Sequence, residues 1–270
     1  MMVDEKQFEA LVKRVLEQEP EERDAFLTED DVKCLCKAEK ESLETRETIV
    51  GYPSHPLCKE LSKMLKMWMD SRRCPILDLP SYDLLDEKCY VESRSATVHS
   101  LTPMLEGLKT LWSLWSDEER AYRIKDILKS LGKRGILDLL GLRKTVGSAD
   151  LWPVDRTLLE RSFNEKHGAG SELTVGARAL AKHHHRDASS SWWGTSTGNE
   201  KSRNEHALKM MNKILDEATW INIHCLPHEI KIVEVRQSEG YGVRWTADGS
   251  AFRGFVEPQM VDGHAVGWRH

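Results

Sequence analysis

Residues 229–257, EIKIVEVRQSEGYGVRWTADGSAFRGFVE, alternate apolar with polar or charged side chains and are interrupted twice by turn-forming residues. A period of two is typical of β-strands that bury one face. Asp248-Gly249 is the strongest short hairpin signal in the chain, because a tight hairpin turn needs residues that accept positive φ. The pattern predicts a small antiparallel sheet with strands at residues 229–237, 241–246 and 251–257.

A two-residue turn at Asp248-Gly249 fixes which residues of the last two strands face each other. Antiparallel partners have residue numbers with a constant sum, so Trp245 is expected opposite Phe252, and Arg244 opposite Arg253. One face is then apolar and packs on the preceding helices, with Tyr241, Val243, Trp245, Phe252 and Val256. The other face carries Arg244, Arg253, Phe255 and Glu257 from this hairpin, and Glu234 and Arg236 from the strand before it.

The charged face has two interpretations. In the first, it is a solvated sheet face on which Glu234 and Glu257 neutralise the arginines, as is common in amphipathic antiparallel sheets. In the second, it binds an anion, because Arg244 and Arg253 side by side need carboxylates or an anion between them. The second is favoured by the Gly240-Tyr241-Gly242 segment and by residue usage, since 9 of the 11 His follow residue 166 and 6 of the 9 Trp follow residue 150.

Upstream of the strands, apolar residues recur at helical spacing. Thr28 and Ser116 are each followed by acidic residues, as helix N-caps are, and Gly132 is expected to end the helix that Ser116 begins. Pro153 suits the first turn of a later helix. Two more helices are expected at about residues 172–184 and 200–219. The first helix shows the clearest apolar stripe, formed by Phe8, Leu11, Val12, Val15 and Leu16.

These patterns predict an α+β protein in two parts. Residues 1–150 are expected to form a mainly helical domain with an acidic N-terminus. Residues 151–270 are expected to form an α+β domain in which helices cover a three- or four-stranded antiparallel sheet. The boundary lies where the helical pattern breaks, between Val146 and Trp152.

The formal net charge is −5, from 39 Lys and Arg against 44 Asp and Glu. The first 50 residues hold 8 basic and 15 acidic side chains, so the acidity is local and argues against an N-terminal arm for nucleic acid. No apolar run reaches the roughly 18 residues that cross a bilayer, and the 6 Cys form no Cys-x-x-Cys pair. We expect no membrane contact, reduced and mostly buried thiols, and a cytoplasmic or nuclear location.

Two segments before the sheet are candidates to contribute to a site. In residues 182–186, KHHHR, consecutive side chains point about 100° apart on a helix, so a basic helix end is favoured over a metal site. His184 is nonetheless a candidate for a functional histidine. The loop and helix start that follow serve either as an anchored connection or as an aromatic and cationic surface for a base or sugar. The residues in question are Trp192, Trp193, Lys201 and Asn204.

Other chemistries find little support in the sequence. A zinc site from Cys34, Cys36, His55 and Cys58 is disfavoured because Cys34 and Cys36 diverge by about 200° on a helix. No phosphate loop, dinucleotide fingerprint, zinc finger or nucleophile elbow is present. We therefore expect neither a bound metal nor a cofactor.

Several segments of residues 174–270 resemble the C-terminal part of a family of uncharacterised proteins from plants, algae and other microbial eukaryotes. They include ATWINIH, EVRQSEGYGVRW, DGSAFRGFVEP and DGHAVGWRH. That family has no established activity, so this resemblance implies no catalytic residues. GYGVRW and FRGFVEP are also similar to the terminal strands of bacterial toxin ribonucleases of the barnase-like and EndoU-like kind. This similarity implies a helical segment ahead of a small antiparallel sheet whose polar face holds His, Arg and Glu.

We expect residues 180–270 to bind a phosphorylated or nucleotide-like ligand, and metal-independent cleavage of RNA by acid–base chemistry is one activity that such a site would support. Such cleavage needs a base at the 2′-hydroxyl, an acid at the leaving oxygen and cations at the phosphate. The candidate acids and bases are His184, His264, Glu234 and Glu257, and the candidate phosphate ligands are Arg236, Arg244 and Arg253. The alternative is a non-enzymatic interaction module whose helical half contacts a partner protein.

Overall fold

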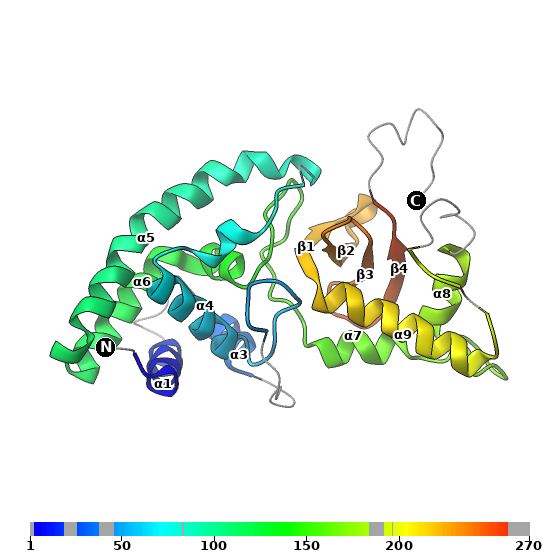
Figure 1. Cartoon of the computed structure of the whole chain (residues 1–270), viewed down its shortest axis with the longest axis horizontal. Coiled ribbons are helices and arrows are strands. Elements are labelled where there is room, and N and C mark those ends of the chain that lie inside the picture. Colours follow the sequence, from blue (N-terminus) through cyan, green and yellow to red (C-terminus); the bar gives the residue numbers. More distant parts are fainter. Residues whose placement is uncertain are drawn as a thin grey trace. The chain divides into compact units, whose positions relative to one another are not determined.

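In the computed structural model, contacts within the chain divide the protein into two compact units, Met1–Trp152 and Pro153–His270 (Figure 1). The structure describes residues 3–18, 26–37, 46–82, 84–183, 192–195 and 197–258. Over these residues the first unit is helical and the second contains a four-stranded antiparallel sheet, so the predicted α+β class is confirmed. None of the helices in the described ranges is long and apolar enough to cross a membrane.

The first unit follows the apolar stripes of its sequence. The predicted stripe of the first helix, from Phe8 to Leu16, is buried, and both predicted N-caps form capping boxes, Thr28 with Asp31 and Ser116 with Glu119. The helices are α1 (Glu5–Leu16), α3 (Glu29–Cys36), α4 (Leu57–Ser71), α5 (Val91–Leu111) and α6 (Asp117–Leu139). Short 3-10 helices are η1 (Pro75–Asp78), η2 (Leu84–Tyr90) and η3 (Trp112–Leu114).

The predicted break at Gly132 is confirmed, but a second helical segment follows it. Gly132 does take a left-handed φ of 58°, and it interrupts the helical geometry, but α6 resumes and continues to Leu139. The reason is that Ile136, Leu137 and Leu139 lie beyond the glycine and are buried. Burial of these side chains favours a second helical segment after the kink.

The second unit places three helices against one sheet (Figure 1). α9 packs against β2 and β3, whereas α7 and α8 pack against β4. α7 begins at Arg156, capped by Asp155, so Pro153 precedes the helix instead of occupying its first turn. The strand order is β1-β2-β3-β4, all antiparallel. The elements are α7 (Arg156–Phe163), α8 (Val175–His183), α9 (Glu200–Asp216), β1 (Ala218–Cys225), η4 (Pro227–Glu229), β2 (Lys231–Gln237), β3 (Gly242–Thr246) and β4 (Phe252–Val256).

A bulge in β4 changes the predicted pairing of the hairpin. Trp245 lies opposite Phe252 as predicted, but Arg244 lies opposite Gly254, and Arg253 is the extra residue between the two pairs. The expectation that Arg244 and Arg253 face each other was therefore wrong. The extra residue also exchanges the faces beyond it, so Phe255, opposite Val243, lies on the apolar face, and Val256, opposite Gly242, on the polar one.

The apolar face of the sheet packs on the helices. The Trp245 indole N–H donates to the Leu159 carbonyl of α7 at 3.1 Å. The Phe163 ring, at the end of α7, meets the Phe252 and Phe255 rings edge to face, with centroids 4.8 and 6.0 Å apart. These contacts fix the sheet in place and leave its opposite face to carry the polar side chains.

Candidate active site

The polar face of the sheet carries a row of residues that pair directly across all four strands. Asn222 of β1 lies opposite Glu234 of β2, Glu234 opposite Arg244 of β3, and Arg244 opposite Gly254 of β4. His224 lies two residues along β1 from Asn222, so it shares this face. The strand register thus gathers a carboxylate, an imidazole and guanidinium groups on one surface.

Glu234 is the centre of this polar cluster. Its Oε1 accepts from Arg236 Nε at 2.5 Å, and its Oε2 accepts from Arg244 Nε at 2.7 Å and lies 3.2 Å from His224 Nε2. Glu234, His224 and Arg236 are only 2%, 4% and 6% exposed. A buried carboxylate with three nitrogen partners is well satisfied and holds those partners in fixed positions.

The charge of the Glu234 carboxyl decides which ring nitrogen of His224 donates a hydrogen bond to it. Burial would raise the pKa of the Glu234 carboxyl, but the hydrogen bond from His224 and the charges of Arg236 and Arg244 lower this pKa well below the usual 4.5. The carboxylate is therefore ionised near neutral pH and can only accept hydrogen bonds. His224 must then donate to it from Nε2, and in the neutral form of this tautomer the lone pair lies on Nδ1.

Arg236 is an internal residue and not a surface ligand. Besides Glu234, it binds the carbonyls of Gly240 and Glu257, with Nη1 at 2.6 and 2.8 Å. Gly242 leaves room for the Arg236 side chain, because a Cβ at position 242 would lie 2.7 Å from Arg236 Cγ. Arg236 thus ties the β2–β3 turn and the residue after β4 to the buried carboxylate.

Arg244 and Arg253 remain accessible to an anion. The Arg244 side chain is 21% exposed, and only its Nε is used by Glu234; neither Nη atom donates to the residues that the structure describes. Across the strand pair, Gly254 leaves open space, because a Cβ there would meet nothing within 4 Å. Arg253, at the bulge, is exposed and makes no side-chain hydrogen bond within the described ranges.

A second histidine–carboxylate pair joins α8 to the end of the sheet. His183 Nδ1 hydrogen-bonds the Glu257 carboxylate, and the His183 ring packs beside Trp193 and Phe255. The Glu257 carboxylate therefore faces α8 and not the arginines with which it was expected to share a face. The candidates His184 and His264 lie outside the described residues.

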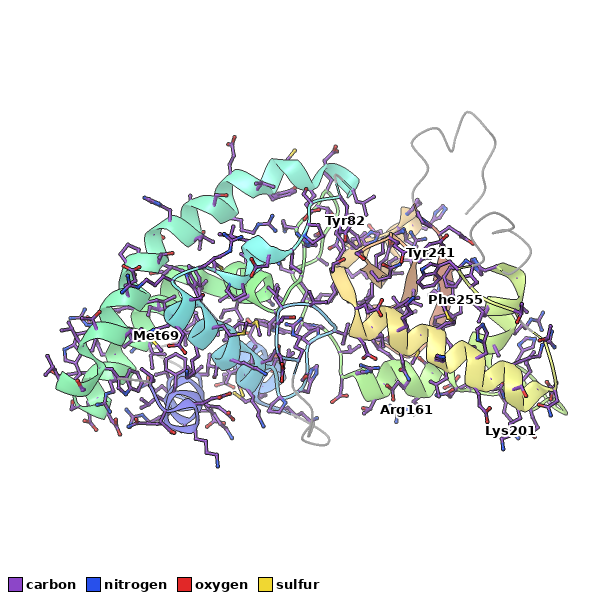
Figure 2. The ribbon with its side chains drawn as sticks, viewed as in Figure 1. Met69, Tyr82, Arg161, Lys201, Tyr241 and Phe255 are labelled. Carbon is purple, nitrogen blue, oxygen red and sulfur yellow. The ribbon has the colours of Figure 1, made fainter. Side chains whose placement is uncertain are left out.

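The aromatic and polar candidates of the preceding loop are spread over the second unit. Trp193 is 1% exposed and packs on Tyr241 and Phe255, both labelled in Figure 2, so it belongs to the core. Trp192 is half-buried and stacks on Tyr241 with centroids 4.2 Å apart. Asn204 binds the backbone of Glu172 and Thr174. Lys201 is exposed at the end of α9 that lies away from the strands (Figure 2).

The sequence interpretation missed His224 because it missed β1. The predicted helix was extended to residue 219, whereas α9 ends at Asp216 and β1 starts at Ala218. A signal was present: in ATWINIH the apolar Ile221 and Ile223 alternate with Asn222 and His224. In the structure the first seven residues of β1 are all buried, polar ones included. The alternation therefore does not mark one face as exposed, and the segment was taken for the end of a helix.

The described residues show neither a metal-binding cluster nor a disulfide. Within the ranges that the structure describes, no group of three or more His, Cys, Asp or Glu side chains is placed to hold a metal ion. The 6 cysteines are free, and Cys34, Cys89 and Cys225 are exposed. The expectation that the thiols are mostly buried was therefore wrong, because only Cys58 and Cys74 are fully buried.

Comparison with known proteins finds one family model that matches part of the second unit. Residues 163–257 match a family model described as the CdiA C-terminal tRNase toxin domain. The match runs from the last residue of α7 to the residue after β4, so it includes the whole sheet and the Glu234 cluster. No curated protein and no solved structure matches the chain. The similarity to toxin ribonucleases is thus supported, while the resemblance to the plant and algal family finds no support.

Proposed function

We propose that the second unit cleaves RNA by general acid–base chemistry on the polar face of the sheet. The observation that carries the proposal is the buried, ionised Glu234, which holds both the His224 imidazole and the Arg244 guanidinium. A base and a phosphate-binding cation are two of the three groups that this reaction needs. Support also comes from the toxin-domain match, which spans these residues.

In the proposed step, His224 Nδ1 accepts the proton of the ribose 2′-hydroxyl. The 2′-oxygen attacks the adjacent phosphorus, the bond to the 5′-oxygen breaks, and a 2′,3′-cyclic phosphate and a 5′-hydroxyl form. Glu234 holds the imidazole through Nε2 and stabilises the imidazolium that develops. The Arg244 Nη atoms and Arg253 stabilise the charge on the phosphate, beside the space left by Gly254.

The leaving 5′-oxygen needs a proton, and our candidate acid is His264, with His184 as the other candidate. Both lie outside the residues that the structure describes. The remaining candidates take different roles in this proposal. Glu234 positions His224 and does not exchange protons with substrate, since both of its oxygens are occupied by Arg236, Arg244 and His224. Arg236 holds the loops around the site.

The substrate class that we propose is transfer RNA. The family model is named for a tRNase toxin domain, and proteins that act on RNA reach single-stranded loops more easily than paired helices. The half-buried Trp192 ring stacks on Tyr241 and has Lys213 Nζ 4.9 Å from its centroid, and this aromatic and cationic surface is our candidate for contact with an unpaired base.

The test is incubation of the full-length protein with total tRNA, followed by analysis of the product ends. The proposal predicts fragments that end in 2′,3′-cyclic phosphate, and a rate about 100- to 10,000-fold lower for His224→Gln. Arg178→Gln is the matched control, because Arg178 is exposed on α8 and makes no side-chain hydrogen bond to the described residues. Circular dichroism checks that both variants are folded.

Two results would overturn the proposal. One is the absence of tRNA cleavage by the folded wild-type protein, which would favour the interaction module. The other is cleavage at the wild-type rate by His224→Gln, which would place the chemistry elsewhere in the molecule.

A further inference from the structure

Two cysteines of the first unit meet where α3 packs against α4. Cys36 is the last residue of α3, and Cys58 lies in the first turn of α4. Their thiols share a hydrogen bond. Cys58 is 3% exposed, while Cys36 is partly exposed and so lies at the edge of the contact. We refer to Cys36 and Cys58 as the dithiol.

The surroundings of the dithiol favour one thiolate. Hydrogen bonding by Cys36 lowers the pKa of the Cys58 thiol, with further lowering by Lys13 and by the backbone N–H of Lys59, although burial opposes this effect. The hydrogen bond to Cys58 raises the pKa of Cys36, as does burial, and Glu17 adds to it. A lower pKa enlarges the thiolate fraction of Cys58, and a thiolate is the form of cysteine that undergoes exchange.

We propose that Cys36 and Cys58 form a reversible disulfide by exchange with a low-molecular-weight disulfide such as glutathione disulfide. Cys36, the more exposed sulfur, attacks the oxidant while its proton passes to the Cys58 thiolate, and one glutathione leaves as a thiolate and takes a proton from water. The Cys58 sulfur then attacks the Cys36 sulfur of the mixed disulfide, and its proton leaves with the second glutathione. The two protein sulfurs are oxidised and one glutathione disulfide is reduced to two thiols.

Cys34 and Cys74 of the same unit lack this arrangement. Cys34 is exposed, but burial of its thiol and the charge of Asp31 raise its pKa. Cys74 is buried, and burial raises the pKa of its thiol to about 12. Neither shares a hydrogen bond with a second thiol among its interactions. The disulfide is therefore expected at the dithiol and not at these positions.

The bond would join the end of α3 to the start of α4 and close the chain between residues 36 and 58 into a loop. A cross-link over a loop of this length restricts the unfolded chain, so the oxidised protein is expected to melt on the order of 5 °C higher than the reduced one. This proposal concerns the first unit only and does not depend on the ribonuclease proposal.

The experiment uses the full-length protein, reduced, desalted and then treated with glutathione disulfide. Trypsin cuts after Lys33 and Lys37 and leaves Cys34 and Cys36 on one peptide, so the assay is made in Cys34→Ser. After alkylation of free thiols, mass spectrometry should find residues 34–37 linked to residues 47–59, and reduction should separate them. Cys36→Ser, at a partly exposed position, should abolish both the linked peptide and the rise in Tm.

Two outcomes would overturn the proposal. The first is full alkylation of Cys36 and Cys58 after treatment, with no linked peptide. The second is a Cys36 that carries glutathione and is never resolved by Cys58. Cys74→Ser serves as the second control, because it leaves the dithiol intact and should still give the linked peptide.

Discussion

Glu234 decides the chemistry of the polar face at the scale of single residues. Two guanidinium groups and one imidazole surround its carboxylate, and each forms a hydrogen bond with it. Burial of such a group is costly unless every charge is paired. The same cluster therefore stabilises the sheet and directs His224, and a change at Glu234 should affect both properties.

Glu234→Gln keeps the size of the side chain and removes its charge. We expect a loss of about 3–5 kcal/mol in the free energy of unfolding, because Arg236 stays buried without a counter-charge. Urea unfolding of both proteins at neutral pH measures this difference. A loss below about 1 kcal/mol would contradict the role given to the cluster.

The same variant tests the charge state of Glu234. The pKa of this carboxyl is lower in the folded protein than the ordinary 4.5, so its contribution to stability is present above about pH 4.5 and is lost as pH falls toward the folded value. The stability gap between wild type and Glu234→Gln should therefore narrow below pH 4.5. A gap that stays constant or widens on acidification would show that the carboxylate is not stabilised by its partners.

At the scale of elements, β3 and β4 shape the site through one glycine each. Gly242 lets Arg236 cross β3, and Gly254 leaves the space beside Arg244 open. The bulge at Arg253 turns Phe255 toward the helices, where it meets Trp193 and Phe163. The sheet can therefore pack one face on helices while the other keeps its polar cluster.

Gly242→Ala should disturb this arrangement. Its Cβ would lie 2.3 Å from the Val235 carbonyl oxygen and 2.7 Å from Arg236 Cγ, so strand or side chain must move. We expect a loss of about 1–3 kcal/mol in stability, measured by thermal unfolding. Gly168→Ala is the control, because its Cβ would meet nothing within 4 Å and the expected change lies within about 0.5 kcal/mol. Equal stability of the two variants would show that the Val235 carbonyl and the Arg236 side chain leave room for a Cβ at position 242.

At the scale of the whole molecule, the two units differ in charge and in chemistry. The second unit, Pro153–His270, holds 15 Lys and Arg and 15 Asp and Glu, so the net charge of −5 belongs to the first. Attraction of RNA to the second unit therefore depends on where its arginines lie and not on an excess of positive charge. The proposed function is accordingly a property of the local cluster on the sheet.

Much of this architecture follows from the sequence, and the departures have physical causes. Period-two alternation predicted β2, β3 and β4, and the shared face of Glu234 and Arg236 followed from their spacing. The bulge at Arg253 was not predictable from alternation, because one inserted residue reverses every later side chain. β1 and its His224 were missed because the preceding helix was extended over the start of this strand, to residue 219.

The central claim is that ionised Glu234 fixes His224 with its proton on Nε2 and its lone pair on Nδ1. The direct measurement is a 15N-detected NMR spectrum of histidine-labelled protein at neutral pH, with His224 assigned by the His224→Gln variant. The account predicts the Nε2-protonated form in wild type and a changed imidazole signal in Glu234→Gln. A ring protonated on Nδ1 alone, with the same spectrum in both proteins, would contradict it.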